Sequence, residues 1–277
     1  MTEDGIRMQE TEERAPSADL RPEVAHPARV YDVWLGGKDN FASDRAVAEH
    51  LATMTPHVVN AARANRAFLG RAVRAVSSLG VSQFLDIGTG IPAAGNTHQV
   101  AQQANASARV AYVDNDPIVL THARALMSGV GHGATTVTQA DLRDPEEILS
   151  APGVRDLLDF SQPIALMLVA VLHFIGDDQD PQGIVKRLLE ALPGGSHLIL
   201  THGTGDTLPQ DLAALAEQSY DQASANLHLR PRQEVARFFG GGELLEPGMV
   251  LAPFWRPDAP LGADAERLGI YAGVARY

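Results

Sequence analysis

Apolar positions follow two different patterns along the chain, and the change falls near Gly80. In Pro56–Leu79 they recur at helical spacing, whereas from Gln83 onward short apolar runs alternate with amphipathic segments. Short strands that alternate with helices are typical of a parallel sheet covered by helices on both faces. The pattern therefore predicts an α/β domain over residues 81–277, preceded by a helical N-terminal cap over residues 25–80.

Seven apolar runs are expected to form strands. They are Gln83–Ile87, Arg109–Val113, Thr135–Thr138, Pro163–Val169, Ser196–Leu200, Leu244–Leu251 and Gly269–Arg276. The fourth run is apolar at every position, which indicates a central strand buried on both faces. The sixth is expected at the edge of the sheet. The last run follows it closely and would most simply return antiparallel.

Helices are expected around these strands. They are Ala28–Leu35, Ser43–Leu51, Pro56–Leu79, Ile118–Met127, one that begins at Asp144 and Pro145, Pro181–Leu192, Leu208–Ala225 and Leu229–Phe239. Pro56–Leu79 is either one long amphipathic helix or a broken pair. Ser43 is the expected N-cap of the second helix. The turn GGKDN, Gly36–Asn40, has two interpretations. It is either an exposed turn with solvated charges or a lid over a ligand, since Tyr31, Trp34 and Phe41 flank it.

The stretch QFLDIGTGIPAAG, Gln83–Gly95, predicts a strand, a glycine turn and a helix. Its strand ends near Asp86, and Gly88 and Gly90 let the backbone turn sharply and let a ligand approach the main chain. Pro92 is expected in the first turn of the helix, where its missing N–H is not needed. Such a turn directs unpaired backbone N–H groups at whatever lies over the carboxyl end of the strand.

Two nucleotide chemistries use this geometry. A dinucleotide places its pyrophosphate at the helix end, and a carboxylate just before the first glycine would repel it. S-adenosylmethionine instead carries an ammonium and a sulfonium, which Asp86 would stabilise. Asp86 therefore favours S-adenosylmethionine. Because GTGIPA also fits the dinucleotide pattern G-x-G-x-x-A, that alternative stays open.

Polar residues also follow the second and third predicted strands. Asp114 and Asn115 follow the second strand, where a carboxylate beside the glycine turn can accept hydrogen bonds from both ribose hydroxyls. Asp116 fits the chemistry of a helix N-cap. After the third strand, we expect Asp141 to accept a hydrogen bond from the exocyclic amine of a base. Leu142 would offer an apolar surface or a backbone N–H.

Four further residues are candidates for the site. His173 follows the fourth strand, across the crevice from the glycine turn, where substrate would meet cofactor. It is either a general base or substrate contact, or a packed or capping residue. His202 is the other residue that could deprotonate an amine or hydroxyl acceptor. Asn65 and Arg66, in the third predicted helix, either point at the site or are solvated or capping groups.

The composition narrows the possible partners. Among 277 residues there are 34 acidic and 22 basic side chains, only two of the latter lysines, and no cysteine. The lack of cysteine excludes disulfides, thiolate catalysis and cysteine-ligated metals, and no metal site is expected. A net charge of −12 without a basic stripe disfavours nucleic acid as a bulk substrate. A small-molecule substrate is expected instead.

The first residues and the longest apolar run indicate where in the cell the protein is expected. Residues 1–24 alternate in charge and have no apolar segment, so a disordered leader is expected instead of a signal peptide. The longest apolar run, Pro163–Ile175, is too short to span a bilayer. A cytoplasmic protein without membrane association is expected.

The order of the motifs resembles a known superfamily. DIGTG, YVDNDP, ADLRDP, a buried strand ending in LHF, and LPGGS before a fifth strand resemble class I S-adenosylmethionine-dependent methyltransferases across Gln83–Tyr277. More narrowly, ARVYDVWLGGKDNFASDR at Ala28–Arg45, together with QFLDIGTG and VLHFIGDD, is similar to the family known as S-adenosyl methyltransferase, formerly a domain of unknown function.

The resemblance implies a Rossmann-like α/β fold, with a seven-stranded, mostly parallel sheet whose last strand is reversed and a helical N-terminal cap. By position it implies that S-adenosylmethionine is bound by Asp86, Gly88, Gly90, Asp114, Asn115, Asp141 and Leu142. Pro92 departs from the glycine common at that position. The implied activity is in-line methyl transfer to a small molecule that the resemblance does not identify. A non-catalytic module that binds the cofactor or a partner, and an NAD-dependent oxidoreductase, remain alternatives.

Overall fold

The structure is a computed structural model that describes residues 20–121 and 134–277. Its α-helices are α1 (Pro27–Leu35), α2 (Ala42–Met54), α3 (Val58–Ser78), α4 (Thr97–Ala104), α6 (Pro145–Ser150), α7 (Pro152–Arg155), α8 (Pro181–Glu190), α9 (Gln210–Gln218) and α10 (Arg232–Arg237). Short 3₁₀ helices are η1 (Leu172–Phe174), η2 (Asp177–Gln179), η3 (Ala252–Phe254) and η4 (Ala265–Arg267). The strands are β1 (Gln83–Ile87), β2 (Arg109–Asp114), β3 (Thr135–Gln139), β4 (Ala165–Val169), β5 (His197–Gly203), β6 (Glu243–Leu244), β7 (Val250–Leu251) and β8 (Ile270–Arg276).

The predicted mostly parallel sheet with a reversed last strand is confirmed. Its strand order is β3-β2-β1-β4-β5-β8-β6, and β7 pairs with β8. β1 to β5 run parallel, and β8 pairs antiparallel with β5 over its full length. β4 lies between β1 and β5, and its residues 165–168 are fully buried, as the uniformly apolar run predicts.

The predicted single edge strand Leu244–Leu251 is wrong. The chain forms β6 and β7 there, both paired with β8, so residues 20–121 and 134–277 form a sheet of eight strands instead of seven. Pro247 has no N–H to donate to a ladder, and Gly248 adopts a φ of 83°, which turns the backbone away from extended geometry. This Pro-Gly pair therefore divides the run into two short strands.

The helix after the glycine turn begins later than predicted. Pro92 lies in a loop, and α4 starts at Thr97 after Asn96, whose side chain accepts a hydrogen bond from the N–H of Ala93 (3.1 Å). Gln99 completes a capping box by accepting from the N–H of Asn96 (3.0 Å). The polar pair, and not the proline, sets the start of the helix.

The predicted N-cap of α2 is also wrong. The helix begins at Ala42, and the carboxylate of Asp44 accepts a hydrogen bond from the N–H of Phe41 (2.7 Å). The hydroxyl of Ser43 donates instead to the carbonyl of Pro22 (2.7 Å). An acidic residue in the first turn therefore replaces the serine as the group that satisfies the helix end.

Two predicted helices in the C-terminal half are shorter than expected. In place of Leu208–Ala225 and Leu229–Phe239 the structure has α9 and α10. Pro231 precedes α10 in an extended conformation, and a proline disfavours helical geometry in the residue before it. The predicted helix Ile118–Met127 starts within residues 117–121 and its remainder lies outside the described residues, as does most of the leader.

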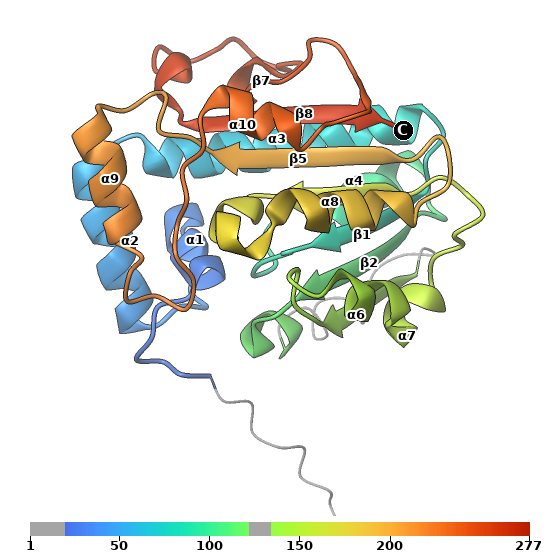
Figure 1. The fold of residues 1–277 in the computed structure, drawn as a ribbon, viewed down its shortest axis with the longest axis horizontal. Helices are drawn as coiled ribbons and strands as arrows, with labels where there is room; N and C mark the ends of the chain where they lie inside the picture. The colour runs from blue at the N-terminus through green and yellow to red at the C-terminus, as the bar shows by residue number, and fades with distance from the viewer. Residues whose placement is uncertain (1–19, 122–133) are drawn as a thin grey trace, which may run out of the picture.

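Figure 1 shows the sheet between α8 and α10 in front and α3 and α4 behind. An apolar layer on each face of the sheet packs against these helices. On one face, Phe84 and Met167 pack with Phe68 of α3. On the other, Leu85 and Leu166 pack with residues of α6, α7, α8 and α10. Because α3 packs on the sheet, the N-terminal helices are anchored to the α/β part. The division of the chain at residue 80 remains a prediction.

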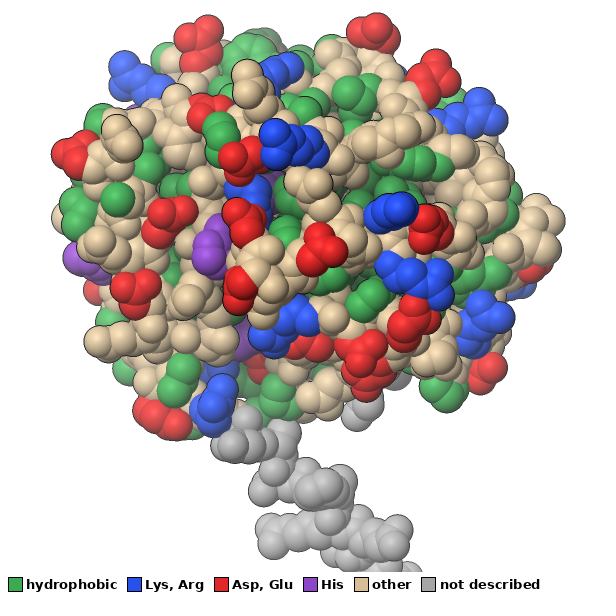
Figure 2. Space-filling view, viewed as in Figure 1, with side chains coloured by type: hydrophobic (Ala, Val, Ile, Leu, Met, Phe, Trp, Pro, Cys, Tyr) green, Lys and Arg blue, Asp and Glu red, His purple; other side chains and the backbone are tan. Residues whose placement is uncertain are grey.

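The outer surface is mixed in charge. On the face shown in Figure 2, acidic and basic side chains lie among one another without a stripe of one sign. Among residues 20–121 and 134–277, every helix is too short or too polar to span a membrane.

Candidate functional site

A cavity of about 470 Å³ lies at the carboxyl ends of the parallel strands. Its walls come from α1 and α3, the glycine turn after β1, the residues that follow β2, β3 and β4, and residues 203–229. Figure 1 shows α1, α2 and α9 at this end of the sheet. Ligands of parallel sheets bind at this edge where the strand order reverses, here between β1 and β4. The volume is typical of a small-molecule site.

The glycine turn has the predicted backbone geometry. Gly88 and Gly90 have φ values of 73° and 67°, in the region that favours glycine. A Cβ on Gly88 would lie 2.4 Å from Cγ2 of Val171, so the turn packs directly against the segment after β4. A Cβ on Gly90 would meet nothing within 4 Å, which leaves space beside its backbone.

Asp86 carries a buried charge at the floor of the cavity. Its side chain is 4% exposed, and Oδ2 accepts a hydrogen bond from the hydroxyl of Thr97 (2.6 Å). Burial raises the pKa of Asp86 to about 6, although the Thr97 hydrogen bond and the charge of Arg66 lower it in part. A carboxylate without a bonded cation is stabilised by a positively charged ligand.

Asp114 is held by two backbone N–H groups. Oδ2 accepts from Gly90 (2.8 Å) and Oδ1 from Asp116 (2.9 Å), so the carboxylate connects the glycine turn to the end of β2. Burial raises the pKa of Asp114 to about 6 despite these two bonds. Each carboxylate oxygen can accept a further hydrogen bond, as two ribose hydroxyls would require.

Asp141 already has a cationic partner. Its carboxylate accepts from Nε (2.8 Å) and Nη2 (2.5 Å) of Arg143, and Asn115 donates to Oδ2 (3.1 Å). The hydrogen bond from Arg143 lowers the pKa of Asp141 to about 2. Leu142 is buried and lines the cavity with Ala140. Sequence reasoning missed Arg143, for which the motif ADLR was the available signal.

Asn65 and Arg66 both line the cavity, which agrees with the interpretation that they point at the site. Asn65 is 2% exposed and donates to the hydroxyl of Tyr31 (2.9 Å). Arg66 donates to Asn96 (2.6 Å) and to the carbonyl of Ala93 (3.3 Å). Within the described residues, Oδ1 of Asn65 and Nε of Arg66 are buried without a hydrogen-bond partner. Each of these two atoms can form one further hydrogen bond with a group in the cavity.

His173 is buried and lines the cavity after β4. Its Nδ1 accepts a hydrogen bond from the N–H of Gly203 (3.1 Å), so the neutral ring carries its proton on Nε2. Burial, and then the charges of His202, Arg230 and His228, lower the pKa of His173 well below its usual value. The side chain is therefore an uncharged donor near neutral pH, and a role as general base would need the other tautomer.

His202 does not belong to the cavity walls. Its Nδ1 donates to the adjacent carbonyl (2.7 Å) and its Nε2 accepts from Arg230 (3.0 Å), while burial lowers its pKa to about 3. Arg230 also donates to the carbonyls of Leu172 (3.3 Å) and Ile175 (2.8 Å). His202 and Arg230 thus support the turn that carries His173.

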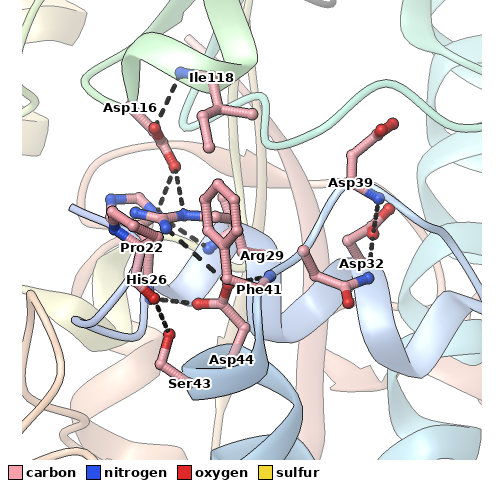
Figure 3. Close-up of polar contacts among 12 residues, drawn as sticks. Pro22, His26, Arg29, Asp32, Asp39, Phe41, Ser43, Asp44, Asp116 and Ile118 are labelled. Carbon is pink, nitrogen blue, oxygen red and sulfur yellow. Dashed lines mark hydrogen bonds and ion pairs between the residues drawn. The ribbon is translucent and has the colours of Figure 1, made fainter. Parts of the chain in front are cut away.

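Figure 3 shows a buried ion pair that fixes the N-terminal helices to the site. Nε of Arg29 donates to Oδ2 of Asp116 (3.1 Å), and its Nη1 lies 3.8 Å from the carboxylate of Asp44. Asp116 also accepts from the N–H of Ile118 (2.9 Å), which confirms its predicted capping role. The Arg29 guanidinium lies over the ring of Phe41, 5.3 Å from its centroid. Sequence reasoning missed this pair, which is separated by 87 positions.

The aromatic residues around the GGKDN turn divide into two groups. Tyr31 and Trp34 line the cavity, whereas Phe41 packs with Ile91 and Ile118 beside the glycine turn. Residues 36–39 are exposed, as the first interpretation of this turn expects. The aromatic side chains that face the cavity therefore belong to the helix α1 and not to the turn after it.

The turn itself folds around Asp32. The Asp32 carboxylate accepts from the side chain of Asn40 (2.8 Å) and from the N–H of Asp39 (3.0 Å). A Cβ on Gly37 would lie 1.8 Å from Oδ1 of Asp32, so any other residue there would displace the Asp32 carboxylate. These contacts give the polar turn a structural role.

The residues around the cavity fit S-adenosylmethionine. Asp86 and the unpaired Oδ1 of Asn65 are suited to an ammonium group, and the unpaired Nε of Arg66 to a carboxylate. Asp114 is suited to the ribose hydroxyls. No comparable cluster of donors for a pyrophosphate lines the described part of the glycine turn, where Gly90 N–H is already bonded to Asp114.

This fold and site define a class of protein: a Rossmann-like class I methyltransferase that uses S-adenosylmethionine. The model of the S-adenosyl methyltransferase family matches residues 13–277, and the chain belongs to that family. The protein is thus an S-adenosylmethionine-dependent methyltransferase, and the predicted family and cofactor are confirmed. Family membership does not support the alternative of an NAD-dependent oxidoreductase.

Two solved structures are similar over nearly the whole chain. One is a DUF574 family protein from Streptomyces avermitilis MA-4680, with 42% identity, a TM-score of 0.89, and coverage of 93% of this chain and 99% of that one. The other is a candidate methyltransferase from Thermobifida fusca YX, with 41% identity, a TM-score of 0.86, and coverage of 94% and 98%. No curated protein matches the sequence.

Proposed function

We propose that this methyltransferase transfers the methyl group of S-adenosylmethionine in line to a small-molecule acceptor bound in the cavity described above. One observation carries the proposal. The buried carboxylate of Asp86 and the glycine turn lie in the same cavity as an apolar compartment formed by α1, α2 and residues 216–229. A cofactor site and an acceptor site would therefore share one cavity.

Particular residues would hold the cofactor. Asp86, a buried carboxylate, and Asn65 would bind the ammonium, and Arg66 would bind the carboxylate, because Oδ1 of Asn65 and Nε of Arg66 are buried without a partner. Asp114 would accept from the ribose hydroxyls. At Gly90, the open space beside the backbone supports close approach of the cofactor.

The base of the cofactor would lie beside the residues that follow β2 and β3. Asp141 and Leu142 would contact it, and Asn115 would orient Asp141 through their hydrogen bond (3.1 Å). Gly88 would contribute indirectly, because its missing side chain lets the glycine turn pack against Val171.

When bound, S-adenosylmethionine supplies the methyl group and its sulfonium leaving group. The chain's own contribution is to orient the two reactants and to exclude water. Orientation alone can contribute an effective molarity on the order of 10⁵ M or more. Tyr31 and Trp34 of α1 would cover the reactants from one side. Catalysis would thus not require a strongly basic residue.

The non-catalytic alternative predicts a cap that leaves no room beside the methyl group. The volume of about 470 Å³, with walls on both sides of β4, favours an enzyme over a sensor. A net charge of −12 and the interspersed surface charges in Figure 2 favour a small acceptor over nucleic acid. The helices before residue 80 would act as the cap of this site.

Isothermal titration of the full chain with S-adenosylmethionine, S-adenosylhomocysteine and NAD tests the assignment. We expect the first two to bind and Asp86→Asn to weaken binding of both by at least about tenfold, because a charge-assisted contact to the ammonium is lost. Asp211→Asn, at an acidic position in the first turn of α9, is the control and should bind as the parent does. Tight binding of NAD alone would reject the proposal.

A further inference from the structure

The cavity continues from the glycine turn into an acceptor compartment, which we define by Tyr31, Trp34, Leu51, Phe174, Tyr220 and Leu227. These walls come from α1, α2, η1 and the segment after α9. The rings of Phe174 and Tyr220 lie 5.4 Å apart, and Trp34 and Leu227 pack in the same cluster. Aromatic and leucine side chains of this kind favour a flat, apolar molecule.

The compartment offers no counter-ion to a cationic acceptor. Acidic residues that line the described part of the cavity are Asp32, Asp86, Asp114, Asp116 and Asp141. Four of them belong to the strand ends at the cofactor side. The fifth, Asp32, is turned into the GGKDN turn, where it accepts from Asn40 (2.8 Å). A protonated amine in this compartment would lose its hydration without gaining a paired charge, which is costly.

Two hydrogen-bond donors are available there instead. Nε2 of His173 carries the proton of a ring whose Nδ1 accepts from Gly203 (3.1 Å). Tyr220 is 2% exposed, and burial raises the pKa of its hydroxyl, which therefore stays protonated. Neither Nε2 of His173 nor the Tyr220 hydroxyl has a hydrogen-bond partner within the described residues. Two donors with no partner suit an oxygen that carries negative charge.

Burial lowers the pKa of two histidines that line the cavity, His173 and His26. The free electron pair of His173 is engaged by Gly203, and Arg230 and His202 lie behind its ring. His26 also lines the cavity, and its Nδ1 accepts from the N–H of Ala28 (3.3 Å). His57, at the start of α3, is the remaining histidine of the cavity walls. An acceptor that ionises on its own would need none of them.

We infer that the acceptor is a flat aromatic molecule with an acidic hydroxyl, of the phenol class, which binds as its oxyanion against Nε2–H of His173 and the hydroxyl of Tyr220. This inference rests on the proposed function of the same cavity. The phenolate oxygen forms a bond to the methyl carbon while the carbon–sulfur bond breaks, and its electron pair stays on sulfur as a neutral thioether. No proton moves in this step, because the phenol has already released it to solvent.

Absorbance titration of 4-nitrophenol with the full chain, loaded with S-adenosylhomocysteine, tests the inference, since the visible band of this probe marks its phenolate. We expect the pKa of the bound probe to fall by about one unit or more relative to the free probe. 4-Nitroaniline, which has the same shape and no acidic hydroxyl, should bind at least about tenfold more weakly. Equal binding of the two probes, or a bound nitrophenol that stays neutral, would overturn the inference.

Matched variants locate the contacts. His173→Asn keeps an acceptor for the Gly203 N–H and removes the donor at Nε2, whereas His173→Gln places an amide donor near Nε2. We expect His173→Asn and Tyr220→Phe each to weaken 4-nitrophenol binding about tenfold and to raise the pKa of the bound probe, with partial recovery in His173→Gln. Loss of ionisation in His57→Asn alone would point to a base and contradict the inference.

The two proposals fail in different ways. S-adenosylhomocysteine should bind each of these variants as it binds the parent, which also shows that they are folded. If the parent chain bound no S-adenosylhomocysteine, the proposed function would fail. If the cofactor product bound normally and 4-nitrophenol did not bind, the acceptor inference alone would fail.

Discussion

Arg29 and Asp116 form a buried ion pair, 3.1 Å long, that joins the first helix to the residues after β2. The N–H of Asp116 donates in turn to Asp114 (2.9 Å), the carboxylate that we propose as the ribose ligand. One residue therefore contacts both the N-terminal helices and the proposed cofactor site. This relationship predicts that docking of α1 and binding of the cofactor depend on each other.

Removing the arginine should destabilise the protein. Arg29→Met leaves Asp116, which is 2% exposed, without its cation, and an uncompensated buried charge costs about 3–5 kcal/mol. We expect that loss in the free energy of unfolding, measured by urea denaturation. Hydrogen exchange in α1 and α2 should accelerate more than in β4. Arg74→Met, which removes an exposed pair with Asp258, is the matched control and should cost less than about 1 kcal/mol. Equal losses in the two variants would contradict this account.

Much of the fold could be predicted because the local pattern of apolar and polar residues indicates which side chains are buried. The run PIALMLV identified the central strand, since a strand covered on both faces must be apolar at every position. The limits of other elements depended on single polar groups. Asn96 and Gln99 set the start of α4, and Pro247 with Gly248 divided the edge strand. Single residues of this kind indicate the end of an element less clearly in the sequence than the periodic pattern indicates the element itself.

The strand ends of the site could be placed in the same way, because parallel strands bring their carboxyl ends to one edge. Contacts across the cavity could not. The hydrogen bond that sets the tautomer of His173 comes from Gly203, 30 positions away, and the ion pair of Arg29 spans 87. Only the folded chain brings these groups together, so sequence alone left the role of His173 open.

Cofactor affinity should depend on pH through Asp86 and Asp114. Burial raises the pKa of each to about 6 in the ligand-free protein. The ionised form of Asp86 binds the ammonium and that of Asp114 accepts from the ribose hydroxyls, so affinity for S-adenosylmethionine should be highest near pH 7 and should fall by about tenfold per carboxylate at about pH 5. Isothermal titration across this range measures the effect. Asp86→Asn should remove one of the two contributions, and a pH-independent affinity in the parent would contradict the prediction.

The same raised pKa values have the opposite consequence for stability. Because the folded-state pKa exceeds the ordinary value of 3.8, the ligand-free folded protein holds protons that the unfolded chain releases. This contribution to stability is present below about pH 4 and is lost as the pH rises through about 6. Urea denaturation of the parent and of Asp86→Asn should therefore show a smaller loss over this interval in the variant. An equal slope in both would show that Asp86 titrates normally.

Replacing Gly88 should lower the stability of the protein more than replacing Gly90. In Gly88→Ala the new Cβ meets Val171 at 2.4 Å in addition to an unfavourable φ of 73°, so we expect a loss of about 2–4 kcal/mol in unfolding free energy. In Gly90→Ala the new Cβ meets nothing, and only the φ cost of about 1 kcal/mol applies. Urea denaturation measures both.

Measurements of cofactor affinity should give a second difference between Gly88→Ala and Gly90→Ala. The methyl group in Gly90→Ala enters the space proposed for the cofactor, so affinity for S-adenosylhomocysteine should fall although the protein remains nearly as stable as the parent. Val171→Ala should restore part of the stability lost in Gly88→Ala, because it removes the clash and leaves the backbone strain. No rescue by Val171→Ala would exclude the contact as the cause.

Arg66 should recognise the carboxylate of the cofactor and nothing else in it. Its Nε is buried without a partner, while Nη2 is fixed by Asn96 (2.6 Å), so the guanidinium is held in place for one further acceptor. Arg66→Met should weaken S-adenosylhomocysteine by about tenfold or more. It should leave unchanged the affinity for 5′-methylthioadenosine, which lacks the amino-acid carboxylate and so serves as the internal control. Isothermal titration of both ligands decides the matter, since a general disturbance of the cavity would weaken the two equally and a contact specific to the carboxylate would not.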